Sequence, residues 1–135
     1  MSLQLLPVVK SMVLCQDVLP GPAGTGDVHL MNVFSAVRPH SFPAYPYVLP
    51  QLRVFLQLTD GVGQGPAAVS GVQLETGDVV FSSQPHVIQF QDRLQVQFVV
   101  FRLVDYCDFP APGLYSIQFR YHRHWVADSL LNLIE

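Results

Sequence analysis

The residues best suited to chemistry in this chain are two histidines near its carboxyl end, His122 and His124. Residues i and i+2 of a β-strand project from the same face, so both imidazoles could reach one metal ion. A third ligand could come from His40, His86 or Asp128. The pair has no carboxylate or cysteine at a fixed spacing, which makes it a weak metal signal and favours a solvated polar face.

Two other patterns resemble reactive motifs but lack the partners that the chemistry needs. The glycine-rich segment 61–65 has neither the Gly-Lys-Ser/Thr ending nor the following helix of a phosphate-binding loop. Cys15 lies in an apolar run with no histidine or acid paired to it, which predicts inert packing. The chain also has no Gly-x-Ser-x-Gly elbow and no His-Glu-x-x-His sequence. We therefore expect no catalytic residues, no cofactor and no enzymatic activity.

Composition narrows the classes of partner. The chain has 135 residues, a formal net charge of −3, and only 13% charged residues. Its one basic cluster, residues 120–125, is too short to outweigh an acidic chain, so we expect no nucleic-acid binding. No run reaches the roughly 18 apolar residues that span a bilayer, so we expect no membrane contact. A surface so poor in charge is weakly protected against association, which favours a homo-oligomer or a protein partner.

The apolar run from Leu3 to Cys15 could pass for a signal peptide. It is interrupted by Pro7 and Lys10, however, and no small-residue cleavage site follows it. We therefore expect a soluble, cytoplasmic protein. In that compartment Cys15 and Cys107 are predicted to be two buried thiols, the alternative being a disulfide between sheets in a secreted protein.

The spacing of apolar residues predicts a chain built from β-strands. In the clearest case, which follows a Pro-Gly turn, apolar and polar residues alternate, the apolar set being Tyr115, Ile117, Phe119 and Tyr121. About seven to nine strands with turn signals between them predict one antiparallel, immunoglobulin-like β-sandwich domain over residues 1–135. Tyr115 fits the tyrosine corner of such sandwiches, in which the hydroxyl bonds back to nearby backbone.

The predicted strands cover residues 8–15, 28–34, 51–60, 67–75, 79–81, 87–90, 94–106 and a stretch from 114 onwards. The segment 125–134 is either a strand or a short helix. Strands 67–75 and 79–81 are expected to form a hairpin. Loops are predicted over 17–27, 37–50 and 61–66, where proline and glycine are frequent. Residues 99–101 are apolar on both faces, so we expect cover on both sides, by the proline-rich segment 37–50 or by a partner.

Within the proline-rich loop, Phe42, Tyr45 and Tyr47 are the best candidates for contact with a partner. Tyrosine and proline provide rigid contact area at low entropic cost, as binding surfaces prefer. The alternative is a loop that folds back to cap the core.

Several short motifs together resemble a family of small, uncharacterised bacterial proteins with a single β-sandwich domain. They are 13–18 (Val-Leu-Cys-Gln-Asp-Val), 32–34 (Asn-Val-Phe), 41–43 (Ser-Phe-Pro) and 109–115 (Phe-Pro-Ala-Pro-Gly-Leu-Tyr). The resemblance implies a bacterial source and carries no known activity. Gln16 stands where an acid would be expected, which weakens the case for a carboxylate metal pair there.

Together these patterns predict a non-enzymatic β-sandwich protein that acts through protein–protein contacts or self-association, since unpaired strand edges are templates for pairing between chains. The alternative is a metal- or small-ligand-binding domain, with or without enzymatic activity, built around His122 and His124. A carbohydrate-binding module is a weaker option because Trp125 is the only tryptophan.

Overall fold

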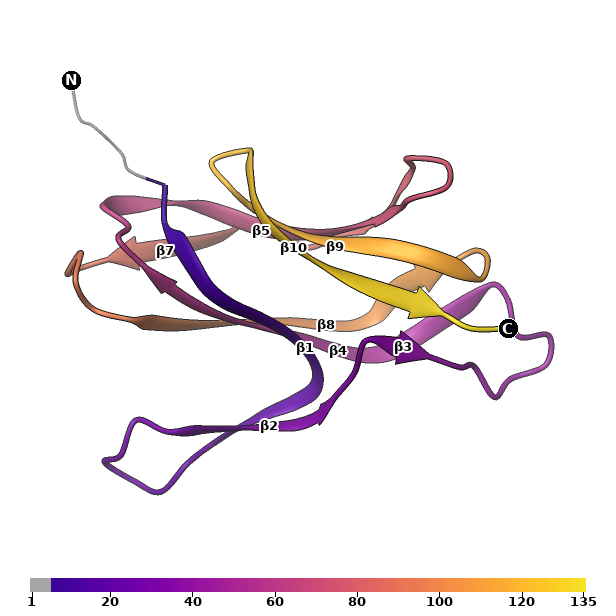
Figure 1. Cartoon of the computed structure of the whole chain (residues 1–135), viewed down its shortest axis with the longest axis horizontal. Coiled ribbons are helices and arrows are strands. Elements are labelled where there is room, and N and C mark those ends of the chain that lie inside the picture. The colour runs from indigo at the N-terminus through magenta and orange to yellow at the C-terminus, as the bar shows by residue number, and fades with distance from the viewer. Residues whose placement is uncertain (1–5) are drawn as a thin grey trace.

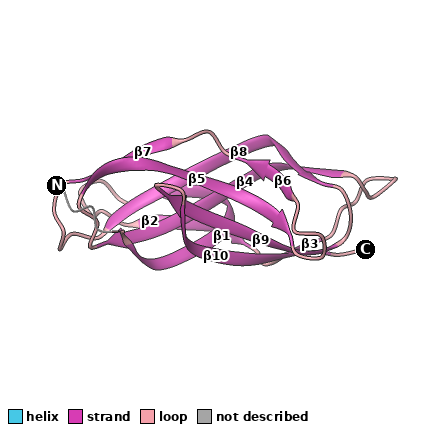
Figure 2. Cartoon of the chain, turned by 90° about the horizontal axis from the view of Figure 1, so that it is seen from above, coloured by secondary structure: helices cyan, strands magenta, loops and turns pink. Residues whose placement is uncertain are grey.

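The structure, a computed structural model, describes residues 6–135, apart from the side chains of residues 105 and 106. This part of the chain forms ten strands and no helix, which confirms the all-β prediction (Figures 1 and 2). The described residues include no helix that is long and apolar enough to cross a membrane. The strands are β1 (Val8–Pro20), β2 (Val28–Val33), β3 (Ala36–Val37), β4 (Tyr47–Thr59), β5 (Gly63–Gln73), β6 (Val79–Ser82), β7 (His86–Phe90), β8 (Gln97–Phe109), β9 (Gly113–Tyr121) and β10 (His124–Leu133).

The strands form two sheets that lie one above the other (Figure 1). The four-stranded sheet has the order β2-β1-β4-β8, and the six-stranded sheet has the order β3-β10-β9-β5-β6, with β7 also paired to β5. Every pair is antiparallel except β3–β10. The additional strand relative to our prediction is β3, whose two residues are too few to produce an alternation pattern.

The main hydrophobic core fills the space between the sheets, because alternate residues of each strand point inward. Its fully buried members include Leu56 of β4 and Phe119 of β9. At the start of β9, the hydroxyl of buried Tyr115 donates a 2.6 Å hydrogen bond to the carbonyl of Ala111. The hydrogen bond predicted from the Pro-Gly-Leu-Tyr pattern is therefore present.

Three predicted loops are partly strand. β1 extends to Pro20, and the true loop begins at Gly21, where the Gly21 amide bonds to the Asp27 carbonyl at 2.7 Å. β4 begins at Tyr47, and Pro50 is accommodated because the register shifts beside it, so its missing N–H interrupts no regular ladder. The proline and glycine content misled the prediction because pairing with a neighbouring strand stabilises these short extensions.

The glycine-rich stretch predicted as a flexible loop is the beginning of β5, which pairs with β7. Gly65 is required by close packing, since a Cβ there would lie 2.0 Å from Nε2 of His122. The hairpin predicted over 67–75 and 79–81 is confirmed as the antiparallel pair β5–β6. The final segment is a strand, because β10 pairs with β9 along most of its length.

A second, smaller hydrophobic cluster covers the outer face of the four-stranded sheet. Cys15, Val18 and Phe55 are buried there, and residues of β2 pack against them. Phe101 belongs to the main core, whereas Val100 packs against this outer cluster. The cover expected on both faces of residues 99–101 therefore comes from β1, β2 and β4 on the outer side, and the proline-rich segment is not part of it.

Candidate protein-interaction edge

His122 and His124 do not lie on one strand. His122 and Arg123 are the two central residues of the β9–β10 turn, both with positive φ (50° and 67°), as a type I′ turn requires. His124 is the exposed first residue of β10. The shared strand face on which the metal prediction rested is therefore absent.

The residues considered as a third ligand are also dispersed. Asp128 accepts a hydrogen bond from the Ser116 hydroxyl (3.2 Å). His86 on β7 packs edge-on against Phe101, and His40 is exposed in the proline-rich loop. Among the residues that the structure describes, no three histidine, cysteine or acidic side chains gather closely enough to hold a metal ion.

The turn nevertheless buries two polar atoms that find no hydrogen-bond partner among the described residues, the hydroxyl of Tyr121 and Nε2 of His122. Their rings pack edge to face, with centroids 4.8 Å apart. Desolvation raises the pKa of Tyr121, so the hydroxyl stays neutral. The backbone N–H of His122 donates to the Pro66 carbonyl at 2.9 Å, which ties the turn to β5.

Both cysteines are buried and unpaired, as predicted. They lie on opposite faces of the four-stranded sheet, Cys107 in the main core and Cys15 in the outer cluster. Burial raises the pKa of Cys107 to about 12 and also raises that of Cys15. Because only the thiolate is nucleophilic, burial and the raised pKa values both disfavour reaction of these thiols at neutral pH.

The aromatic segment 42–47 is partly packed against the rest of the chain and partly exposed. Phe42 is fully exposed, at 101% of its reference area. Tyr45 donates its hydroxyl to the carbonyl of Ile134 at 2.7 Å, and Tyr47 packs partly against the main core. Tyr45 and Tyr47 thus help to cap the core, and only Phe42 projects freely into solvent.

The longest open strand edge belongs to β8. This 13-residue strand pairs with β4 on one side and with no described strand on the other. β7 likewise pairs only with β5. The two strands lie on the same side of the sandwich (Figures 1 and 2), joined by residues 91–96, so two unpaired edges face each other across the gap between the sheets.

A groove runs between these two edges. It consists of three neighbouring hollows of about 370, 300 and 360 Å³. The middle hollow shares His86 and Val100 with the first, and Gln89, Gln97 and Phe98 with the last. We call this continuous surface the β7–β8 groove.

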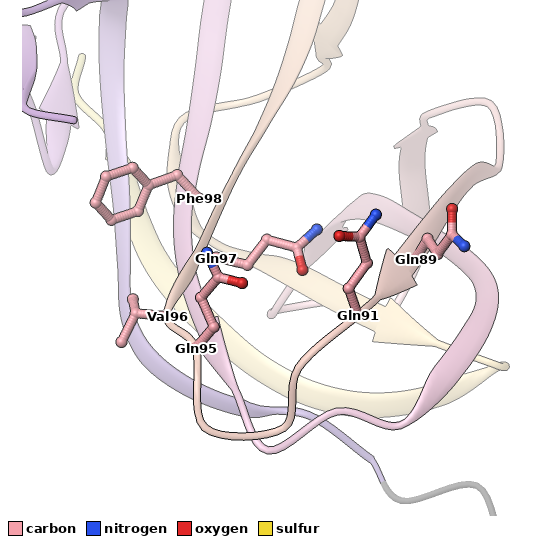
Figure 3. A pocket seen from close by; sticks show the side chains of 6 residues that line it. All are labelled: Gln89, Gln91, Gln95, Val96, Gln97 and Phe98. Atoms are coloured by element: carbon pink, nitrogen blue, oxygen red, sulfur yellow. The ribbon is translucent and has the colours of Figure 1, made fainter. Parts of the chain in front are cut away.

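One end of the β7–β8 groove is lined by four glutamines, Gln89, Gln91, Gln95 and Gln97 (Figure 3). The side chains of Gln91 and Gln97 point toward each other, whereas Phe98 points to the opposite side of β8, where its ring lies 5.4 Å from that of Phe55. None of the four amide groups makes a hydrogen bond within the described part of the chain.

The other end of the groove is basic. Arg102 and His86 line it, and among the side chains that the structure describes no carboxylate lines the groove. Arg102 stands directly opposite Arg53 of β4. Arg53 itself has only a long contact with Asp17 (Nε to Oδ1, 3.9 Å), and its Nε and Nη1 atoms are buried without hydrogen-bond partners.

No protein-family model and no curated protein matches this chain. The resemblance to small bacterial sandwich proteins therefore stays a prediction.

Sequence reasoning missed the groove. In the sequence, the glutamines occupy the polar positions of strands in which polar and apolar residues alternate. The sequence does not show which strands lie at the edge of a sheet. One signal was available: glutamines recur at i and i+2 on both sides of the turn at 92–94. That spacing places amides on one face of each flanking segment.

Proposed function

We propose that this chain is a non-enzymatic, immunoglobulin-like β-sandwich that acts through protein–protein contact, by accepting an extended segment of a partner protein at the open edge of β8. The observation that carries the proposal is the 13-residue length of that edge beside a second unpaired strand, β7. Main-chain hydrogen bonds to an added strand provide affinity, and alternate side chains provide specificity.

The β8 edge has little of the protection that exposed edges usually carry. Natural edge strands avoid pairing through prolines, inward-pointing charges or very short length. β8 contains no proline, and residues 97–101 are uncharged. Phe98 and Val104 are 41% and 46% exposed beside the edge. The edge strands β3 and β6 of the other sheet have two and four residues, so β8 is a longer template than either.

The immunoglobulin-like assignment and a cytoplasmic location belong to the same proposal. The tyrosine-corner hydrogen bond between Tyr115 and Ala111 supports the first, because this contact is typical of such sandwiches. The two unpaired, buried thiols support the second, because disulfides are rare in the cytosol.

A library of random twelve-residue peptides displayed on phage tests the proposal. We expect binders that slow amide hydrogen exchange in β8 and that lose affinity when Phe98→Lys places a charge beside the edge. Leu74→Lys is the matched control, since Leu74 is similarly exposed (48%) and lines none of the hollows. Binders that protect another surface, or that are indifferent to Phe98→Lys, would refute the proposal.

A further inference from the structure

We infer that the occupant of the β7–β8 groove is an extended peptide segment with an acidic residue at one end, which pairs with Arg102, and uncharged residues at the other, which lie against the glutamines. This inference rests on the proposed function and specifies the chemistry of the partner.

The requirement for an acid comes from the uncompensated charge at the basic end. Arg102 and His86 line the same hollow, and among described side chains no carboxylate lies within ion-pairing distance of Arg102. Like charges directly opposite each other in a sheet are destabilising, and Arg102 faces Arg53 in this way. A carboxylate from an added strand would offset that repulsion and accept charge-assisted hydrogen bonds from the guanidinium.

The glutamine end favours neutral side chains. Each amide carries two donors and an acceptor, so four amides without partners can serve both the N–H and the C=O groups of an incoming backbone. A charged side chain placed among neutral amides would give up part of its hydration without an opposite charge in return. The two ends of the groove therefore select different residues.

The lining of β8 sets the length of the segment. Residues from Gln97 to Leu103 line the groove. Seven residues of strand extend roughly 20 Å at about 3.3 Å per residue, so a peptide of seven to ten residues spans the groove.

Charge also argues against a second copy of this chain in the groove. If two β8 strands paired symmetrically about their midpoint, Leu103, the two Arg102 side chains would be diagonal neighbours on one face. Such an arrangement brings two guanidinium groups together, where no described carboxylate lies within ion-pairing distance of Arg102. An acidic segment of another protein is the complementary occupant.

The test uses three synthetic decapeptides with alternating valine and threonine, identical except for a glutamate, glutamine or lysine near one end. Each carries a fluorophore and a short polyethylene glycol tail, and binding is followed by fluorescence polarisation. We expect the glutamate peptide to bind about tenfold more tightly than the lysine peptide, since one charge-assisted hydrogen bond distinguishes them. Arg102→Glu should reverse the order, whereas Arg38→Glu, an exposed site away from the groove, should preserve it.

The outcomes separate this inference from the proposed function. Equal binding of all three peptides, still abolished by Phe98→Lys, would overturn the acidic preference and leave strand addition standing. Absence of peptide binding together with sedimentation as a dimer that Phe98→Lys dissociates would assign the edge to a second copy. Binding of cellohexaose in place of every peptide would assign the glutamines to a carbohydrate. Either of the last two results would overturn the inference.

Discussion

The hydroxyl of Tyr115 donates a 2.6 Å hydrogen bond to the carbonyl of Ala111, four residues earlier in the chain, and closes the turn that leads into β9. Tyr115 is fully buried. Removing its hydroxyl leaves a carbonyl without its partner, so Tyr115→Phe should lower the free energy of unfolding by about 1–2 kcal/mol. Urea denaturation followed by circular dichroism measures the change. A loss below the error of the fit would mean that the corner contributes no stability.

Tyr121 provides the opposite case on the same strand. Its hydroxyl is buried and has no hydrogen-bond partner among the described residues. Folding therefore removes this group from water without replacing the hydrogen bonds that it made there. Tyr121→Phe should therefore leave the free energy of unfolding unchanged or raise it by about 1 kcal/mol. The same urea titration tests it beside Tyr115→Phe. Destabilisation as large as that of Tyr115→Phe would indicate a partner for this hydroxyl, such as a bound water.

Cys107 should make stability depend on alkaline pH. Burial raises its pKa from 9.0 to about 12 in the folded state, so the unfolded chain releases the thiol proton first. The stability that this group contributes is complete below pH 9 and is lost as the pH rises from 9 toward 12. Cys107→Ala removes this dependence.

Urea titrations at pH 8 and pH 10 measure the effect. The difference in unfolding free energy between wild type and Cys107→Ala should shrink by about 1 kcal/mol at the higher pH. Comparing the variant with wild type at each pH cancels the contribution of the tyrosines. A constant difference would mean that the thiol is accessible to solvent in the folded protein.

Gly65 should tolerate no larger residue while His122 is present. A Cβ at this position would meet Nε2 of His122 at 2.0 Å and the Tyr121 hydroxyl at 2.8 Å. Gly65→Ala should therefore cost about 1–3 kcal/mol of stability. His122→Gly removes the imidazole and suits the positive φ of the turn, so the double variant should recover at least half of the loss. Additive effects in this double-mutant cycle would rule out the clash.

Zinc should not stabilise the protein through the two histidines. In the part of the chain that the structure describes, His122 and His124 lie on a turn and at a strand start without a third ligand. Adding equimolar Zn²⁺ should leave the melting temperature unchanged, both in wild type and in His124→Ala. A rise in wild type that disappears in His124→Ala would instead support the metal-binding alternative.

The sequence predicts elements where a local pattern determines the outcome. The alternation along β9 and β4 and the Thr-Gly-Asp turn between β5 and β6 are all local signals, and each gives an element close to its predicted position. The start of β5 escapes prediction because glycine disfavours strands in isolation. Residues 63–66 are extended because they pair with β7, more than twenty residues further along the chain.

The candidate site was less predictable than the fold for a related reason. Whether β8 is central or at an edge depends on the order of strands, which no local pattern encodes. The apolar run 99–101 suggested a fully covered strand, and its outer cover proved to be the small cluster around Phe55. The turn at His122 and Arg123 lacks the Asn-Gly or Asp-Gly signal of type I′ turns, so the two histidines read as one continuous strand.

Val54 and Phe55 are consecutive residues of β4, yet one is buried in the main core and the other in the outer cluster. The β1–β2 hairpin cannot swing away from the sheet without exposing the Phe55 ring to water. Opening of the hairpin would therefore disturb the packing of β4, which lies between β1 and β8 in the sheet. Amide exchange in β2 should consequently be slower than expected for a short edge strand.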